Sequence, residues 1–412
     1  MIKHHEDKSS GSTSWLFFFL GAAINQSQVI LNTNVSISEA LLCIIIIYFT
    51  IKRKLLLPIM QILFFFTVMA ITLSTSFFIT PLKFSYYPAM SDVIRDALKL
   101  TAALLYAVLG FNLSNITEKR AFYRGLSFTA LIIAAIGTAM LFVKLSFLES
   151  IVLYGGSRFK GLMNDPNYYA VITITAIPYF IHESAIKKKA RIAAILILIT
   201  AIMLSGSKTG VLTLLIYLIF EGYKYITGRP QRTKLYSISL MLLSIAMTAL
   251  LLNEQLAAII GNIMQRNLSI SRLAILFRDI DGAISAQGSS RLLAWEIAVK
   301  MIIKSPITGI GIGTYSPVAL VEYGSDAIAH NTYLQITVEW GLFLASAFIL
   351  YLIRQLIVLL RSRLSSSQYV EREILLILLV GSVSISLNNA RLLWLILGML
   401  MLDGSRSIRE SN

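Results

Sequence analysis

Long uninterrupted apolar runs constrain this 412-residue chain more than any other feature. Three examples are LLCIIIIYF at 41–49, ILFFFTVMAITL at 62–73 and IAAILILITAIML at 192–204. Each is long enough to form most of a membrane-spanning helix. Charged residues make up only 14% of the sequence against 56% hydrophobic, too few to cover a water-soluble protein of this size. The sequence therefore predicts an all-α integral membrane protein with a single polytopic membrane domain over 1–412.

The hydropathy pattern predicts about twelve transmembrane helices. They cover 14–32, 37–51, 55–79, 94–112, 126–145, 168–183, 192–206, 209–226, 236–252, 331–360, 374–388 and 391–403. The segment at 331–360 is too long for one straight span, so we expect it to tilt or to break near Gly341. Residues 253–330 are expected to form a long, helical extracytoplasmic segment.

Basic residues, which give a formal net charge of +15, gather in short loops between the apolar runs. These loops are KRK at 52–54, TEKRAFYR at 117–124, KKKAR at 187–191, GRPQRTK at 228–234 and RSR at 361–363. In the alternating arrangement they share one side with both termini, and the positive-inside rule assigns that side to the cytoplasm. Topology therefore explains the positive charge, and no nucleic-acid partner is expected.

The opposite side receives short segments, each of which places a cation or a titratable group at the membrane boundary. They are GSRFKGLMNDPN at 156–167, SGSK at 205–208, SSRLLAW at 289–295 and AHN at 329–331. Helical spacing puts Arg291 on the face of Trp295 and opposite Lys300. A cation on a packed face at a helix N-terminus needs an anion beside it, so Arg291 is a candidate diphosphate ligand. An ion pair with Asp279 or Asp281 is the alternative.

Further candidate anion-binding groups lie in the neighbouring loops. Arg158 and Lys160 belong to a Gly-rich loop that leads to Asp-Pro-Asn at 165–167, and Lys208 follows a Ser-Gly-Ser turn. We predict that Lys160, Lys208 and the asparagines Asn167 and Asn331 bind substrate. The alternative is that the cations snorkel from the membrane interface.

His330 is the candidate general base, because it is the one histidine on the outer side. His4, His5 and His182 fall on the cytoplasmic side. A neutral imidazole is suited to take a proton from a hydroxyl, although a capping or interfacial histidine is the alternative. Glu339 lies nine residues further along and on the opposite face of the helix, so it cannot orient His330 directly. We expect it to be a buried structural acid with another partner.

Nucleotide and metal chemistry are not indicated. There is no Walker loop, GIGIG at 309–313 does not follow a strand, and no His/Asp/Glu group has metal-ligand spacing. Asp165, Asp279 and Asp281 could nevertheless meet in space. An enzyme that works on the outer face has no access to nucleotide sugars and needs an activated substrate, and a lipid diphosphate carried in the membrane fits that need.

Four segments resemble the bacterial O-antigen ligase and O-antigen polymerase family. They are RFKGLMNDPNYYA at 158–170, SGSKTG at 205–210, RLLAW…SPITGIGIGTY at 291–315 and HNTYLQITVEWGL at 330–342, which places the similar core at about 158–342. The resemblance implies a C-type membrane glycosyltransferase fold that needs neither metal nor cofactor. It assigns the anion-binding arginines to Arg158 and Arg291 and the catalytic histidine to His330. Lys208 departs from the family, which often has arginine there.

The resemblance implies transfer of a glycan from undecaprenyl diphosphate to an acceptor hydroxyl, on the periplasmic face of the bacterial inner membrane. The Asp-Pro-Asn and HNTYLQITVEWG forms favour a polymerase; a ligase that uses lipid A-core as acceptor is the alternative. A flippase or other transporter is the rival class, but it would carry charges along the bundle interior and two pseudo-symmetric halves. Membrane lipids and other polysaccharide-assembly proteins are expected partners.

Cysteine-accessibility labelling from outside the cell checks the predicted topology. A cysteine at Gly288 should react and a cysteine at Lys188 should not, because charge alternation places them on opposite sides. Labelling at Lys188 but not at Gly288 would overturn the assignment of the outer face.

Overall fold

The structure is a computed structural model that describes residues 14–27, 36–113, 115–143, 146–227, 289–326, 328–361 and 366–410. Several sequence predictions lie outside these residues: the span at 236–252, the loop at 228–234, and Asp279 and Asp281 within 253–288. The chain divides into two compact units. The first contains Met1–Ala130, Thr175–Ile186 and Ser290–Asn412, and the second contains Leu131–Ile174 and Lys187–Ser289.

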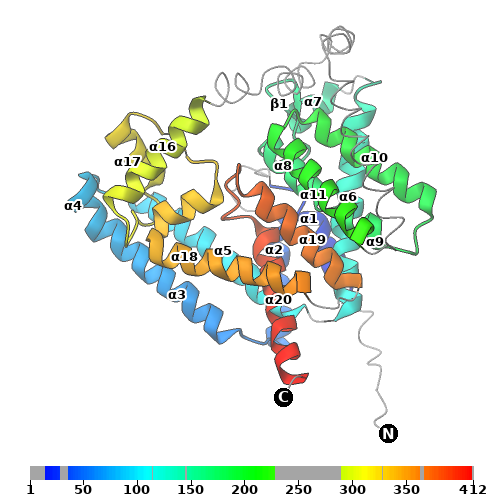
Figure 1. Ribbon diagram of the computed structural model, residues 1–412, viewed down its shortest axis with the longest axis horizontal. Helices are drawn as coiled ribbons and strands as arrows, with labels where there is room; N and C mark the ends of the chain where they lie inside the picture. The colour runs from blue at the N-terminus through cyan, green and yellow to red at the C-terminus, as the bar shows by residue number, and fades with distance from the viewer. Residues whose placement is uncertain are drawn as a thin grey trace. The chain divides into compact units, whose positions relative to one another are not determined.

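The first unit is built from helices (Figure 1). They are α1 (Ser14–Ala23), α2 (Ile37–Ile51), α3 (Ile59–Ser74), the π-helix η2 (Thr75–Ile79), α4 (Thr80–Phe84), α5 (Met90–Asn112), the first part of α6 (Ile116–Ala139), α9 (Ile177–His182), α16 (Ser289–Lys304), α17 (Tyr315–Tyr323), α18 (Thr332–Arg361), α19 (Ser366–Gly381) and α20 (Arg391–Glu410).

The second unit contains the end of α6 and a small hairpin beside helices. Its elements are α7 (Ser146–Val152), β1 (Leu153–Tyr154), β2 (Arg158–Phe159), α8 (Pro166–Ile174), α10 (Lys188–Leu204) and α11 (Lys208–Thr227). The strands pair antiparallel, with Leu153 opposite Phe159 and Tyr154 opposite Arg158.

The helices follow the predicted spans closely in places, and α2 covers 37–51 as expected. Among the described residues, three helical stretches are long and apolar enough to cross a membrane: Ile59–Phe84, Ile116–Ala139 and Thr332–Val358. The predicted span at 168–183 is instead two helices, because Pro178 stands in the first turn of α9 and cannot continue α8. The protein is an integral membrane protein, and the number of about twelve spans stays a prediction.

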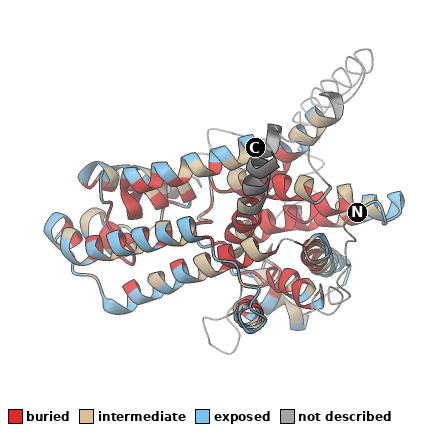
Figure 2. Ribbon diagram, turned by 90° about the horizontal axis from the view of Figure 1, so that it is seen from below, coloured by how far each residue is buried: buried red, intermediate tan, exposed pale blue. Residues whose placement is uncertain are grey.

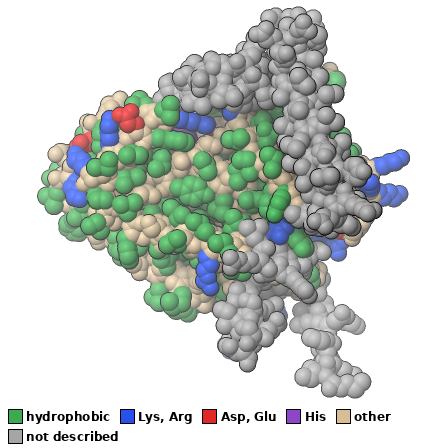
Figure 3. Space-filling view, in the orientation of Figure 1, with side chains coloured by type: hydrophobic (Ala, Val, Ile, Leu, Met, Phe, Trp, Pro, Cys, Tyr) green, Lys and Arg blue, Asp and Glu red, His purple; other side chains and the backbone are tan. Residues whose placement is uncertain are grey.

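The outer surface of the helices is apolar. Many helices have one buried and one exposed side (Figure 2), and Figure 3 shows hydrophobic side chains spread over the visible face. Met60 and Phe66 on α3 are 75% and 63% exposed, and Phe343 on α18 is 76% exposed. Exposed apolar surface on this scale is suited to contact lipid rather than water.

Glycines let neighbouring helices approach closely. A Cβ atom on Gly110 of α5 would collide with the backbone carbonyl of Leu395 in α20, and one on Gly398 with that of Ala107. The contact between α5 and α20 therefore depends on both glycines. Close approach through small residues is how membrane helices gain packing energy where burial from water contributes little.

The predicted break in the long helix near Gly341 is confirmed. Gly341 has φ of 78° and ψ of 167°, so α18 is two helical stretches that meet at this residue. The break exposes the carbonyls of Val338 and Glu339, which accept hydrogen bonds from the backbone N–H groups of Ile310 and Gly311 at 2.8 and 3.0 Å. The glycine-rich loop between α16 and α17 thus supplies hydrogen bonds to the carbonyl groups that the break leaves without helical partners.

Hydroxyl groups hold the same loop from its other side. Ser76 in η2 donates to the carbonyl of Ile312 at 2.8 Å, and Thr80 donates to that of Ile310 at 2.6 Å. A π-helical turn re-aims side chains relative to an α-helix, and it often marks a functional place. Here Ser76 in the π-helix and Thr80, the first residue of α4, direct hydroxyls to the irregular backbone of the loop. Thr314 also donates to the carbonyl of Ile310 at 2.7 Å.

Substituting alanine for Gly309 tests this loop. Gly309 has φ of 67°, and an added Cβ would lie 2.5 Å from the carbonyl oxygen of Val338 and 2.6 Å from the nitrogen of Gly341. Gly324 has φ of 70° with no atom within 4 Å of its added Cβ, so Gly324→Ala is a matched control for backbone strain alone. That strain costs about 1–2 kcal/mol. Thermal unfolding in detergent should show a clearly larger loss of Tm for Gly309→Ala; equal losses would contradict the close approach.

Candidate functional site

Arg158 is the centre of a polar cluster in the second unit. It stands in β2, after a turn in which Gly155 and Gly156 both have positive φ. Its Nε donates to the carbonyl of Ser205 at 2.9 Å, and its Nη2 donates to Oδ1 of Asn167 at 3.1 Å. These two contacts orient the guanidinium group.

Asn167 is itself held by a helix cap. The Oδ1 of Asp165 accepts hydrogen bonds from the backbone N–H groups of Asn167 and Tyr168 at 2.8 and 2.9 Å. Pro166 occupies the first position of α8, where its missing N–H is not needed. The Asp-Pro-Asn sequence therefore ends the loop and presents Asn167 to Arg158.

The Ser-Gly-Ser-Lys turn joins α10 to α11 in the same cluster. Gly206 has φ of 58°, and the buried Ser207 caps α11 by accepting from the backbone N–H of Gly210 at 3.0 Å. Lys208 opens α11 and is half-buried. A Cβ on Gly210 would collide with Ala170 of α8, so this glycine lets α11 pack against α8.

Arg291 lies in the first unit, in the first turn of α16, and is half-buried. Trp295, one turn further on, donates from Nε1 to the carbonyl of Ala329 at 2.7 Å. The opposite face carries the exposed ion pair of Glu296 and Lys300 at 2.6 Å. The predicted orientation of Arg291 toward the packed side agrees with this arrangement, and it brings α16 beside the segment that precedes α18.

His330 is exposed and has φ of 46°, in the left-handed region that favours glycine. Its neighbours are buried and held: Ala329 accepts the Trp295 hydrogen bond, and Asn331 caps α18. The Oδ1 of Asn331 accepts from the backbone N–H groups of Tyr333 and Leu334 at 3.0 and 3.1 Å. Strained backbone that its surroundings maintain is a feature of functional sites.

Glu339 is buried, and its Oε1 accepts a hydrogen bond from Nε2 of Gln335 at 2.8 Å, one turn earlier in α18. Gln335 is thus a partner for the acid that the sequence left unassigned. Tyr315 at the start of α17 is also buried. Burial raises the pKa of its hydroxyl, and the nearby Glu339 carboxylate acts in the same direction.

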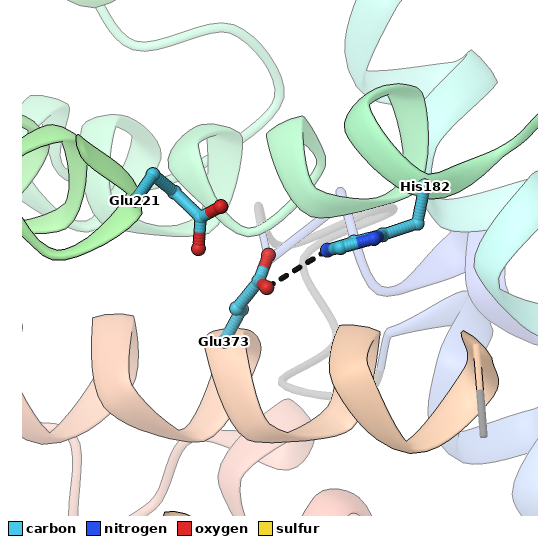
Figure 4. Close-up of side chains that lie close together, drawn as sticks. All are labelled: His182, Glu221 and Glu373. Atoms are coloured by element: carbon cyan, nitrogen blue, oxygen red, sulfur yellow. Dashed lines mark hydrogen bonds and ion pairs between the residues drawn. The ribbon is translucent and has the colours of Figure 1, made fainter. Parts of the chain in front are cut away.

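A second group of charged residues, not predicted from the sequence, lies where α6, α9 and α19 meet. Nε2 of His182 lies 2.8 Å from Oε1 of Glu373 (Figure 4), and Lys119 pairs with the fully buried Glu371 at 2.8 Å. Figure 4 also draws Glu221, which belongs to the second unit. The Glu-Arg-Glu at 371–373, directly before an apolar run, is the sequence signal that could have revealed these pairs.

The predicted site residues thus fall into two groups. In the second unit, Arg158, Asn167 and the turn that leads to Lys208 form one cluster, and Lys160 follows in the same loop with its backbone N–H donating to Val152 at 2.8 Å. In the first unit, α16 with Arg291 contacts the segment that carries His330 and Asn331.

The O-antigen ligase family model matches residues 193–349. The chain carries an O-antigen ligase segment. Among curated proteins, none matches the sequence. The match confirms the family resemblance predicted from the sequence motifs, and it supports an O-antigen ligase or polymerase type of function in surface polysaccharide assembly.

The O-antigen ligase segment covers less than half of the chain, from α10 to the first turns after the break in α18. It contains the Ser-Gly-Ser-Lys turn, α16, the glycine-rich loop and the head of α18. The hairpin with Arg158 precedes it. Gly206, the glycines of the loop and His330 all lie within this segment, and all have positive φ.

Replacing the arginines with lysine tests whether geometry or charge matters. Arg158→Lys and Arg291→Lys should lose nearly as much glycan-transfer activity as the alanine variants. Lysine cannot bond Ser205 and Asn167 from two fixed nitrogens, nor bind a diphosphate at two points. Polysaccharide ladders at matched membrane protein levels measure this, with the exposed Lys300→Ala as control. Full activity of both lysine variants would leave the arginines only a general electrostatic role.

Proposed function

We propose that this protein transfers a glycan from an undecaprenyl-diphosphate-linked donor to an acceptor hydroxyl on the outer face of the bacterial plasma membrane. One observation carries the proposal: within the O-antigen ligase segment, an exposed histidine is held in a left-handed conformation between two anchored residues. A helix cap alone does not need this, because Asn331 already caps α18.

In the proposed reaction the acceptor hydroxyl attacks the anomeric carbon of the donor sugar. The imidazole of His330 takes the hydroxyl proton as the new glycosidic bond forms. The bond from the anomeric carbon to the diphosphate breaks, and the leaving diphosphate takes the electron pair. Arg158 and Arg291 stabilise the negative charge that develops there, so the step needs no metal.

Orientation of the arginine fork supports this role for Arg158. Its contacts with Ser205 and Asn167 come from two other chain segments, and they hold the guanidinium before substrate binds. A preorganised cation loses little conformational entropy on binding an anion. Lys208, Lys160 and Asn331 are proposed to contact the rest of the substrate, and Asn167 to position the arginine as well as bind.

The acceptor distinguishes two versions of the reaction. A polymerase, which the Asp-Pro-Asn and HNTYLQITVEWG forms favour, extends one lipid-linked repeat unit with another. A ligase needs lipid A-core. Purified protein supplied with lipid-linked donor alone should make a ladder of longer glycans if it is a polymerase; product that appears only after lipid A-core is added would assign it as a ligase.

His330→Asn is the sharpest test of the base. Asparagine tolerates the left-handed region but accepts no proton near neutral pH, so it removes the base without adding backbone strain. We expect the variant to insert normally and to lose about 100- to 10,000-fold in turnover with purified lipid-linked donor. The control is His182→Gln, whose amide can still donate to Glu373. Turnover of His330→Asn equal to wild type would reduce His330 to an interfacial residue.

A further inference from the structure

An apolar groove of about 220 Å³ opens between α3, α18 and α20 in the first unit. Its lining residues include Met60, Phe64, Ala347, Tyr351, Trp394 and Met401. They come from the start of α3, the half of α18 after the break, and the first half of α20. On α3 and α18 the lining residues therefore lie toward the helix ends that the charge pattern assigns to the cytoplasm, away from the ends that carry the candidate site.

The walls of the groove are aromatic rings that also pack against each other. The ring centroids of Phe65 and Trp394 are 5.0 Å apart at 62°, and those of Phe348 and Trp394 are 5.2 Å apart at 25°. Such contacts hold the rings in place without a ligand. The groove is thus preformed, and apart from Gln61 and the tyrosine its lining residues are apolar. Its chemistry suits a hydrocarbon chain.

Exposed basic side chains flank the same end. Lys52, Arg53 and Lys54 directly precede the extended entry into α3. Asn112 fixes this entry, because it accepts from the backbone N–H of Leu56 at 2.7 Å and donates to the carbonyl of Leu56 at 2.8 Å.

On α18, the exposed Arg354 follows Tyr351 by one turn. Positive charge is therefore held on α18 and in the segment between α2 and α3.

We propose that this groove binds an acyl chain of an anionic phospholipid from the cytoplasmic leaflet, with Lys52, Lys54 and Arg354 contacting the phosphate. The apolar lining takes the chain, and the long basic side chains reach the headgroup region. Anionic lipids attract basic residues beside membrane helices by about 1 kcal/mol each, a factor of about five in affinity.

The polyprenyl carrier also combines a chain with a phosphate, but it is not the occupant that we propose. Its reacting end must lie at the outer face with Arg158 and Arg291, whereas the basic residues of the groove lie at the opposite helix ends. The phospholipid site does not depend on the glycosyl-transfer proposal, so each can fail without the other.

Thermal unfolding of the purified full-length protein in neutral detergent tests the site. Phosphatidylglycerol at about 100 times its Kd should raise Tm by about 3 °C, and phosphatidylcholine should raise it much less. Ala347→Phe fills the groove from an exposed position and should abolish the difference. Leu350→Phe, at an exposed position on α18 outside the groove lining, should keep it.

A charge variant tests the headgroup. Lys52→Gln/Lys54→Gln/Arg354→Gln should weaken the phosphatidylglycerol response about fivefold per charge. Arg53 is left in place because its φ of 52° makes substitution there a test of backbone strain. The control variant replaces the exposed Lys187, Lys188 and Lys189 with glutamine, and its Tm response to phosphatidylglycerol should equal that of wild type.

Three outcomes would overturn the site. The first is a Tm response to phosphatidylglycerol that Ala347→Phe leaves unchanged, and the second is an equal loss of that response in the 187–189 control. The third is a Tm response that Ala347→Phe abolishes for polyprenyl phosphate, with none for phosphatidylglycerol.

Discussion

Satisfying the backbone of a broken membrane helix is the constraint on which the rest of the first unit depends. Hydrocarbon offers no hydrogen-bond partners, so a break in α18 is stable only where other protein groups meet its freed N–H and C=O groups. The loop after α16 does this in both directions: Ile310 donates to Val338 at 2.8 Å, and Leu342 donates to the carbonyl of Pro306 at 2.7 Å. Glycine is required at 309 and 341 because any side chain would enter the partner backbone.

This arrangement carries through to the candidate site. The loop that fills the break also joins the end of α16 to the start of α17, and both helices pack with Phe84 and Val338 in one buried cluster. Ala329 belongs to that cluster, and His330 is the next residue. The strained histidine is therefore attached to a rigid core, which is what a general base needs in order to stay oriented.

Buried charge in the first unit is used for structure. The buried pair of Lys119 with Glu371 and the half-buried pair of Arg391 with Glu39 link helices distant in sequence. Arg391 also donates to the carbonyl of Gln26 at 2.8 Å. A buried pair contributes modestly to the free energy of folding, but losing one partner leaves an isolated charge and costs about 3–5 kcal/mol. Such pairs specify which helix ends meet. The candidate catalytic groups lie instead at loops and helix starts, where substrate can reach them.

The sequence by itself determined the class of protein, most helix positions, and the residues at which several helices start or break. Apolar runs, the Asp-Pro-Asn cap before α8, the serine turn before α11 and the glycine in α18 act locally, through hydrogen bonds and sterics within a few residues. The sequence also indicated the family, because the order of its motifs can be read without a structure. Only the tertiary structure decided that Arg158 bonds to Ser205, that Trp295 bonds to Ala329, and that the glycine-rich loop fills the break at Gly341. Periodicity shows that a helix face is buried but not which helix covers it, because many apolar helices could cover the same face. The packing partner is selected by the shape of the two surfaces and by the backbone N–H and C=O groups that still need a hydrogen bond.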